Sequence, residues 1–227
     1  MPSTARTHQL QQSLIYHIFN RGHNRSIVFH TSDDFKYFID LLTDYSRASN
    51  MQIHHWVVMS NHYHLAVEFA VPAKVSSIMA GIARSYVYYH HRTYKTAGCI
   101  WQGRFKSQPI QKELYLNACG RYIERNPVKA GMVEVAWEYP YSSAAYYALG
   151  KQDCVTVQSP LFEGFGIGEE SRRQKYQEFL FDFDSEEDTL FDNMEYSRGS
   201  AEFRRRIIKE NGRYIPRRQG RIRTMIA

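Results

Sequence analysis

The sequence lacks a long apolar run, a cysteine pair and a glycine-rich nucleotide motif. No stretch of about 18 consecutive apolar residues occurs in the 227 residues, which excludes an ordinary membrane-spanning helix. The first residues, MPSTARTHQLQQS, lack the apolar core of a secretory signal. Cys99, Cys119 and Cys154 form no CxxC pair, which favours a reducing compartment and argues against a thiolate metal site. We therefore expect a cytoplasmic protein that uses neither a membrane nor a bound nucleotide.

Positive charge and aromatic residues are plentiful instead. The formal net charge is +6, and 15% of the residues are aromatic, among them 17 tyrosines. A basic chain favours a polyanionic partner. Aromatic rings beside Arg and Lys suit stacking on unpaired bases, although a tyrosine-rich core explains many of them equally well.

The hydrophobic pattern of residues 14–131 predicts a small α+β fold. Strands are expected at 14–20, 52–60 and 63–69 and in the last part of 97–110, and helices at 31–50, 73–94 and 112–131. The segment MSNH predicts a hairpin between the second and third strands, and Pro127 should end or disturb the last helix. The order β-α-β-β-α-β plus a helix indicates a ferredoxin-like antiparallel sheet with helices on one face.

The C-terminal third differs in composition from the rest. Residues 182–195 carry seven acids without Lys or Arg, and residues 198–223 carry nine Arg and one Lys against two Glu. We therefore expect a domain at 1–150 and, at 151–227, a mainly helical or irregular extension that is acidic and then Arg-rich.

Two histidines stand two residues apart in the stretch HHWVVMSNHYHLAVEF. In an extended strand His62 and His64 project from the same face, while Tyr63 points the other way. Two imidazoles on one face can chelate a divalent metal, but a surface strand can also carry two His by chance. His54 and His55 are adjacent and face opposite sides, which favours structural roles.

The helix at 112–131 offers a further ligand. Tyr122 and Asn126 are spaced i, i+4 and therefore share one helical face. Two imidazoles and an amide oxygen suit Mg²⁺ or Mn²⁺, completed by water or phosphate oxygens, better than a closed zinc site. Asn126 precedes Pro127, so a plain helix stop is the alternative.

These segments carry a resemblance to a known family. MSNHYHLAVE resembles the HUH motif (His, bulky hydrophobic, His) of the single-tyrosine transposases. YLNACGRYIERNPVKAGMV, with WEYPYSS after it, is similar to the downstream signature of that group, and GCIWQGRFKS matches the segment between them. The matches span residues 14–147, and the most similar subgroup is the REP-associated tyrosine transposases.

The resemblance implies a fold, a reaction and residue roles. It implies a ferredoxin-like core and metal-dependent cutting of single-stranded DNA through a 5′-phosphotyrosine. Its motif histidines fall on His62 and His64, its nucleophile on Tyr122 and its third ligand on Asn126. Relatives often have Gln at that last position, and SNH stands where PNH is commoner. The implied partner is a palindromic DNA hairpin beside a short single strand.

Basic and aromatic residues flank these motifs in sequence and could line a channel for the DNA backbone. They are Arg21, Arg25, Arg84, Arg92, Lys95, Trp101, Arg104 and Lys106. Each charge could equally be a solvated surface group, and Trp101 could equally be core.

Two other functions stay open from the sequence. One is a hairpin-binding regulator without cutting activity, and the other is a metal-dependent RNA-processing enzyme. A homodimer and a monomer are both compatible with the resemblance.

Overall fold

The computed structural model describes residues 14–71, 74–182, 191 and 198–211. In chain order its elements are β1 (Ile15–Arg21), the 3₁₀ helix η2 (His23–Arg25), α1 (Ser32–Ser49), β2 (Met51–Met59), β3 (His62–Phe69), α2 (Val75–Tyr94), β4 (Lys106–Ile110), α3 (Lys112–Lys129), η4 (Ala136–Glu138), α4 (Ala144–Leu149), η5 (Phe162–Phe165), α5 (Glu169–Phe181) and α7 (Ala201–Asn211). The predicted strands and helices of the first 131 residues are all present. The fourth strand is shorter than its segment and begins only at Lys106.

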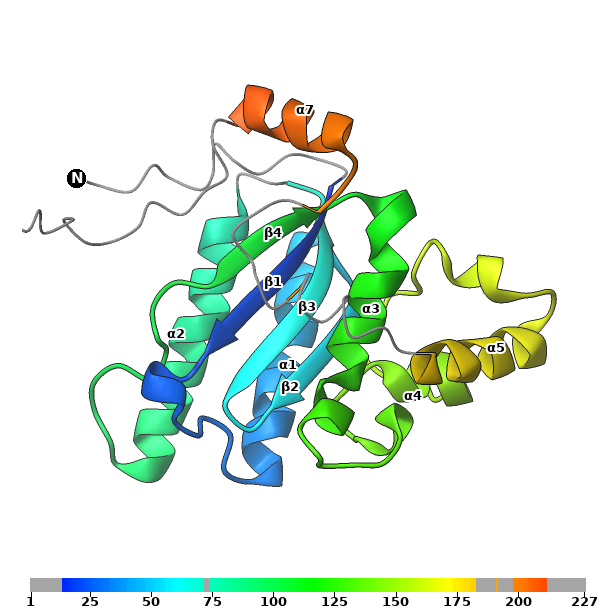
Figure 1. Ribbon diagram of the computed structural model, residues 1–227. Coiled ribbons are helices and arrows are strands. Elements are labelled where there is room, and N and C mark those ends of the chain that lie inside the picture. The colour runs from blue at the N-terminus through cyan, green and yellow to red at the C-terminus, as the bar shows by residue number, and fades with distance from the viewer. Residues whose placement is uncertain (1–13, 72–73, 183–190, 192–197, 212–227) are drawn as a thin grey trace, which may run out of the picture.

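The four strands form one antiparallel sheet in the order β2-β3-β1-β4 (Figure 1). This order, with a helix after β1 and another after β3, confirms the ferredoxin-like α+β fold that the sequence predicts. The hairpin pairing of β2 with β3 is also confirmed. β1 and β3 are the inner strands, so side chains on both have neighbours on either side.

Strand alternation divides the sheet into two faces. Tyr16 and Ile18 of β1, with Tyr63 and Leu65 of β3, join the core beneath α1 and α2. The alternate positions of the strands face α3, which covers the opposite side of the sheet (Figure 1). The two crossover helices therefore share one face, as predicted, and α3 adds a third layer.

Helix α3 continues past Pro127 and ends at Lys129. A proline has no N–H to donate to the carbonyl four residues earlier, which here belongs to Ile123. The Asn126 amide donates to that carbonyl at 3.3 Å and to the Tyr122 carbonyl at 2.8 Å. These hydrogen bonds from the Asn126 side chain replace the missing backbone bond and explain why the helix ends two residues after Pro127.

A buried polar network fixes α3 against β2. Glu124 is fully buried and accepts hydrogen bonds from His55 Nδ1 at 2.9 Å, Ser143 Oγ at 2.7 Å and Tyr176 Oη at 2.9 Å. One turn earlier, a Cβ on Gly120 would lie 2.8 Å from the His55 ring. The helix therefore approaches β2 closely at Gly120, which brings Glu124 within reach of His55.

Residues after 150 pack onto the sheet domain. Trp56 Nε1 donates to Thr156 Oγ1 at 2.9 Å, and Val157 donates its N–H to the Ile53 carbonyl at 2.8 Å. Arg121 donates to the carbonyls of Phe179 and Asp182 at the end of α5. Residues 151–182 thus stay in contact with α3 and β2.

Most of the two charged runs lies outside the described residues. Of the acidic run only Asp182 and Phe191 are described, and of the Arg-rich run residues 198–211. Arg198 donates its N–H to the Pro109 carbonyl at 2.9 Å, next to β4. No helix in the described part of the chain is long and apolar enough to span a membrane.

The Glu124 network yields a stability prediction. Glu124→Ala removes the acceptor shared by three buried donors, of which Ser143 Oγ also reaches the Trp56 carbonyl at 3.3 Å, so we expect the free energy of unfolding to fall by about 3 kcal/mol. Tyr176→Phe removes one donor and leaves the other two bonds in place, so it should cost about 1 kcal/mol. Urea denaturation followed by circular dichroism measures both. A smaller loss for Glu124→Ala than for Tyr176→Phe would contradict the central role of the carboxylate.

Candidate active site

β3 presents the two motif histidines toward α3. His62 is the first residue of β3 and lies opposite Arg21 of β1, and His64 lies opposite Phe19 of the same strand. Their ring centroids are 5.1 Å apart, and the rings are nearly perpendicular. The predicted shared face is therefore present, and Tyr63 between them points into the core beneath α1 and α2.

Helix α3 brings Tyr122 and Asn126 over these histidines. The Tyr122 ring centroid lies 5.5 Å from that of His64, in an edge-on arrangement. Asn126 stands one turn further on, and a hydrogen bond joins its side chain to the His62 ring. The four residues that the resemblance selects are thus gathered from two elements in one place.

Each motif histidine has its Nδ1 atom engaged by a neighbour. His62 Nδ1 lies 2.5 Å from Asn61 Oδ1, and His64 Nδ1 lies 2.8 Å from His17 Nε2. Since a neutral imidazole can use one nitrogen as donor and the other as lone pair, these contacts leave both Nε2 atoms as candidate metal ligands.

Burial keeps both imidazoles neutral near pH 7. Desolvation lowers the pKa of His62 to about 4, against an opposing effect of the hydrogen bond to Asn126. Desolvation also lowers the pKa of His64, and the neighbouring His17, His62 and Lys129 act in the same direction. Neutral imidazole is the form that binds a metal ion.

The amide oxygen of Asn126 is the atom of this side chain that remains for a cation. The amide nitrogen donates to the Tyr122 and Ile123 carbonyls, which uses both of its N–H groups. Two neutral imidazoles and one amide oxygen fit Mg²⁺ or Mn²⁺ with the remaining positions open. Within the described ranges there is no group of three or more His, Cys, Asp or Glu that could hold a metal ion.

Two residues at the site were not found from the sequence. His17 of β1 is fully buried, and its ring stacks on His64 at 5.0 Å and meets Tyr122 edge-on at 5.7 Å. Phe191 is also fully buried, and the centroid of its ring lies 5.4 Å from that of Tyr122. The exposed fraction of Tyr122 is only 6%. Alternation of LIYHIFN could have placed His17 on a face with Ile15 and Phe19, but no local signal points to Phe191.

The eight proposed DNA-binding residues fall into three groups. Arg21 and Arg25 lie at the end of β1 and in η2, and Arg104 and Lys106 lie just before and at the start of β4. Arg84, Arg92 and Lys95 belong to α2 and its C-cap, in the layer on the opposite face of the sheet. Trp101 forms the third group by itself.

The C-terminal end of α2 nevertheless lies at the same end of the sheet as the start of β3, where His62 stands (Figure 1). Two backbone hydrogen bonds join the loop after α2 to the end of β1. His23 donates its N–H to the Ile100 carbonyl at 2.7 Å, and Gln102 donates its N–H to the Arg21 carbonyl at 2.9 Å. Arg21 in turn lies opposite His62. Basic residues of both layers therefore gather at this end of the molecule.

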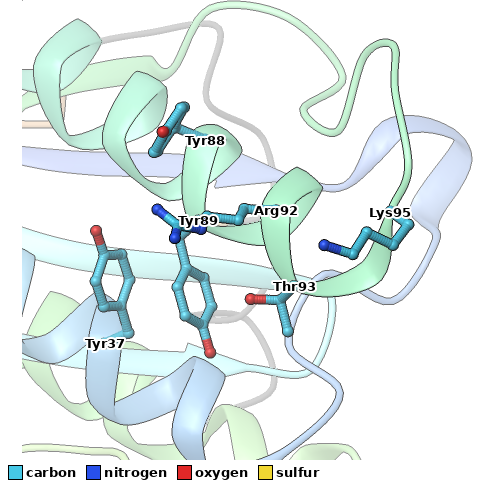
Figure 2. Close-up of a pocket in the computed structure, with 6 residues that line it drawn as sticks. All are labelled: Tyr37, Tyr88, Tyr89, Arg92, Thr93 and Lys95. Carbon is cyan, nitrogen blue, oxygen red and sulfur yellow. The ribbon is translucent and has the colours of Figure 1, made fainter.

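An open pocket marks the outer surface of α2 there. Figure 2 shows its lining side chains: Tyr37 from α1, and Tyr88, Tyr89, Arg92, Thr93 and Lys95 from α2 and its C-cap. Tyr88 is 68% exposed, whereas Tyr37 and Tyr89 stack on each other at 4.1 Å. Tyr88 is thus the most exposed ring of this pocket.

Trp101 is a core residue. Its exposed fraction is 5%, and its ring meets Tyr63 edge-on at 5.6 Å and Tyr86 at 5.9 Å. The sequence leaves contact with DNA and packing in the core as alternatives for this residue, and the structure shows packing in the core. A base cannot stack on this ring in this arrangement.

Comparison with known proteins agrees with this geometry. The model of the family described as transposase IS200 like matches residues 10–126, a range that includes His62, His64, Tyr122 and Asn126. No curated protein matches the chain.

A solved structure, described as a REP-associated tyrosine transposase bound to a REP hairpin, is similar in fold. It matches with a TM-score of 0.55 and 20% identity, covering 70% of this chain and 96% of that one. At this identity the likeness supports the fold alone. Because the family match extends over more than half of the 227 residues, the chain belongs to the IS200-like transposase family.

Proposed function

We propose that the protein is a metal-dependent single-stranded DNA endonuclease and strand transferase that acts at or near palindromic hairpins through a 5′-phosphotyrosine. The observation that carries this proposal is the convergence of Tyr122 on the histidine pair, with 5.5 Å between the ring centroids of Tyr122 and His64. A hydrolase that activates water has no need of a tyrosine at this place.

In the proposed reaction the Tyr122 hydroxyl is the nucleophile. Its oxygen bonds to the scissile phosphorus, the bond to the 3′-oxygen breaks, and that oxygen leaves as a free 3′-hydroxyl after taking up a proton. The phosphodiester energy is kept in the tyrosyl ester, so a different 3′-hydroxyl can attack it and join strands. A bound divalent cation supplies charge to the phosphate oxygens as negative charge develops on them.

His62, His64 and Asn126 have the proposed role of holding that cation. Their positions on β3 and α3 keep the ligands beside the Tyr122 ring, so that a phosphate bound to the cation would already lie next to the nucleophile. Lys129 adds positive charge, with its Nζ 5.8 Å from the centroid of the Tyr122 ring. A tyrosine has an ordinary pKa near 10, so nearby positive charge favours the attacking phenolate.

Hairpin DNA is the proposed partner. The family membership supports DNA as substrate, and the solved structure of similar fold holds a REP hairpin. The net charge of +6 and the basic residues at the His62 end of the sheet agree with a phosphate backbone there.

Tyr122→Phe tests the reaction. The substitution removes only the attacking oxygen, so we expect the variant to fold and bind the hairpin but to form no covalent product. The substrate is a pool of single strands that carry a palindromic hairpin between randomised flanks, labelled at the 3′ end, which stays on the tyrosyl ester. Denaturing electrophoresis after incubation with Mn²⁺ should show a slow-migrating adduct for the wild type alone.

Tyr115→Phe is the matched control, since Tyr115 lies on the same helix, is partly buried and has Cys119 where Tyr122 has Asn126. It should form the adduct as the wild type does. An adduct that persists in Tyr122→Phe would overturn the assignment of the nucleophile. Cut DNA without an adduct in the wild type would indicate attack by water.

We also propose that the DNA backbone extends from the active site to the C-terminal end of α2. Arg21, Arg25, Arg104 and Lys106 would contact it near the site, and Arg92 and Lys95 would contact it at the pocket of Figure 2. Arg84 lies two turns before Arg92 on α2 and would extend this path. The exposed Tyr88 ring offers a stacking surface for an unpaired base.

The double substitution of Arg92 and Lys95 by Ala tests this path. We expect weaker hairpin binding. The slope of log Kd against log salt concentration should also be smaller by about 1 to 2, because two phosphate contacts are lost. Fluorescence anisotropy over a salt series measures this slope. Replacing the exposed Lys151 and Lys175 by Ala removes the same charge at the other side of the molecule and should leave the slope unchanged. Equal slopes for both double variants would exclude this path.

A further inference from the structure

The position of His17 has a consequence for the metal site. His17 lies on β1 and its Nε2 atom is 2.8 Å from His64 Nδ1, both rings being buried. Its ring also stacks on His64 at 5.0 Å, and Phe19, two residues further on, stacks on His64 at 4.7 Å. Two neighbours from one strand thus hold the His64 ring in a single orientation.

Only one of the two nitrogens in this contact can carry the shared proton. If His17 donated Nε2–H to His64, the neutral His64 would carry its own proton on Nε2 and could not offer that atom to a cation. If His64 donates Nδ1–H to His17, then His64 Nε2 keeps its lone pair and the His17 proton is on Nδ1. The second arrangement alone is compatible with His64 as a ligand through Nε2.

We propose that His17 is a positioning residue that accepts the Nδ1–H of His64 and thereby fixes the tautomer and ring orientation in which His64 binds a divalent cation. His17 is not itself a ligand, since its Nε2 atom faces His64 Nδ1. Asn61 Oδ1 stands in the same relation to His62 Nδ1, at 2.5 Å. Metal-binding histidines usually donate their other ring N–H to such an acceptor, and loss of the acceptor weakens metal binding about 10- to 100-fold. This inference rests on the proposed function, because it requires that His64 binds a cation.

The tautomer can be measured in the metal-free wild-type protein. Long-range ¹H–¹⁵N correlation spectra of the ¹⁵N-labelled protein at pH 7 identify which ring nitrogen carries the proton. We expect the proton on Nδ1 of His64 and on Nδ1 of His17. A proton on His64 Nε2 would overturn the proposal, and this result needs no variant and no cation.

Metal affinity gives the second measurement. Mn²⁺ binding, followed by the electron paramagnetic resonance signal of the free ion, should weaken about 10- to 100-fold in His17→Phe, which keeps a ring but has no acceptor. His17→Gln retains an acceptor oxygen and should restore most of the affinity and the Nδ1–H tautomer of His64. His54→Phe is the matched control, because His54 is a buried histidine whose Nδ1 bonds to the Val157 carbonyl at 3.0 Å, away from the motif histidines. It should bind Mn²⁺ as the wild type does.

The outcomes separate this inference from the proposed function. If wild type and His62→Ala bind Mn²⁺ equally poorly, the metal site itself is wrong. If the wild type binds Mn²⁺, His62→Ala does not, and His17→Phe matches the wild type, then His17 has no positioning role and the proposed function stands. Equal losses in His17→Phe and His17→Gln would likewise exclude the acceptor role, provided that both variants show the wild-type circular dichroism spectrum. If neither variant folds, the tautomer in the wild type decides.

Discussion

The docking of α3 onto the sheet is the constraint on which the rest of the site depends. The helix follows β4 after the single residue Gln111, and side-chain contacts then set its position over β2 and β3. Glu124, bonded to His55, Ser143 and Tyr176, fixes the helix along and across β2. Gly120 sets the distance by leaving room for the His55 ring. Tyr122 and Asn126 are carried to the motif histidines by these contacts.

The same helix uses its sides for different purposes. One side carries buried groups that contact the rest of the protein. The neighbouring side carries the groups to which we assign the proposed reaction. Asn126 belongs to both, because its nitrogen donates to the Ile123 carbonyl that Pro127 cannot serve, while its oxygen is the proposed third ligand. A longer Gln at this position would have to satisfy the two carbonyls and reach His62 with one more methylene group. The shorter Asn therefore fits a helix that is continuous through the proline.

Much of the fold and part of the site could be predicted from the sequence. The strand period places His62 and His64 on one face, and the helical period places Tyr122 and Asn126 together, since both are local geometry. His17 could not be assigned to the site, because its contact with His64 depends on the pairing of β1 with β3 across 47 residues. Trp101 had two open interpretations for the same reason: whether a ring is buried depends on residues far away in the chain.

β2 contains an irregularity whose consequence reaches the candidate active site. The pairing with β3 shifts between Ile53 and His55, so that His54 is an extra residue. Before this bulge the odd-numbered positions face α1 and α2, and after it they face α3, as Ile53 and Val57 illustrate. The extra residue reverses the phase of the strand. If the same residues paired with β3 without the bulge, His55 would lie opposite Leu65, on the face of α1 and α2 and away from Glu124, and α3 would lose the contact that aligns Tyr122.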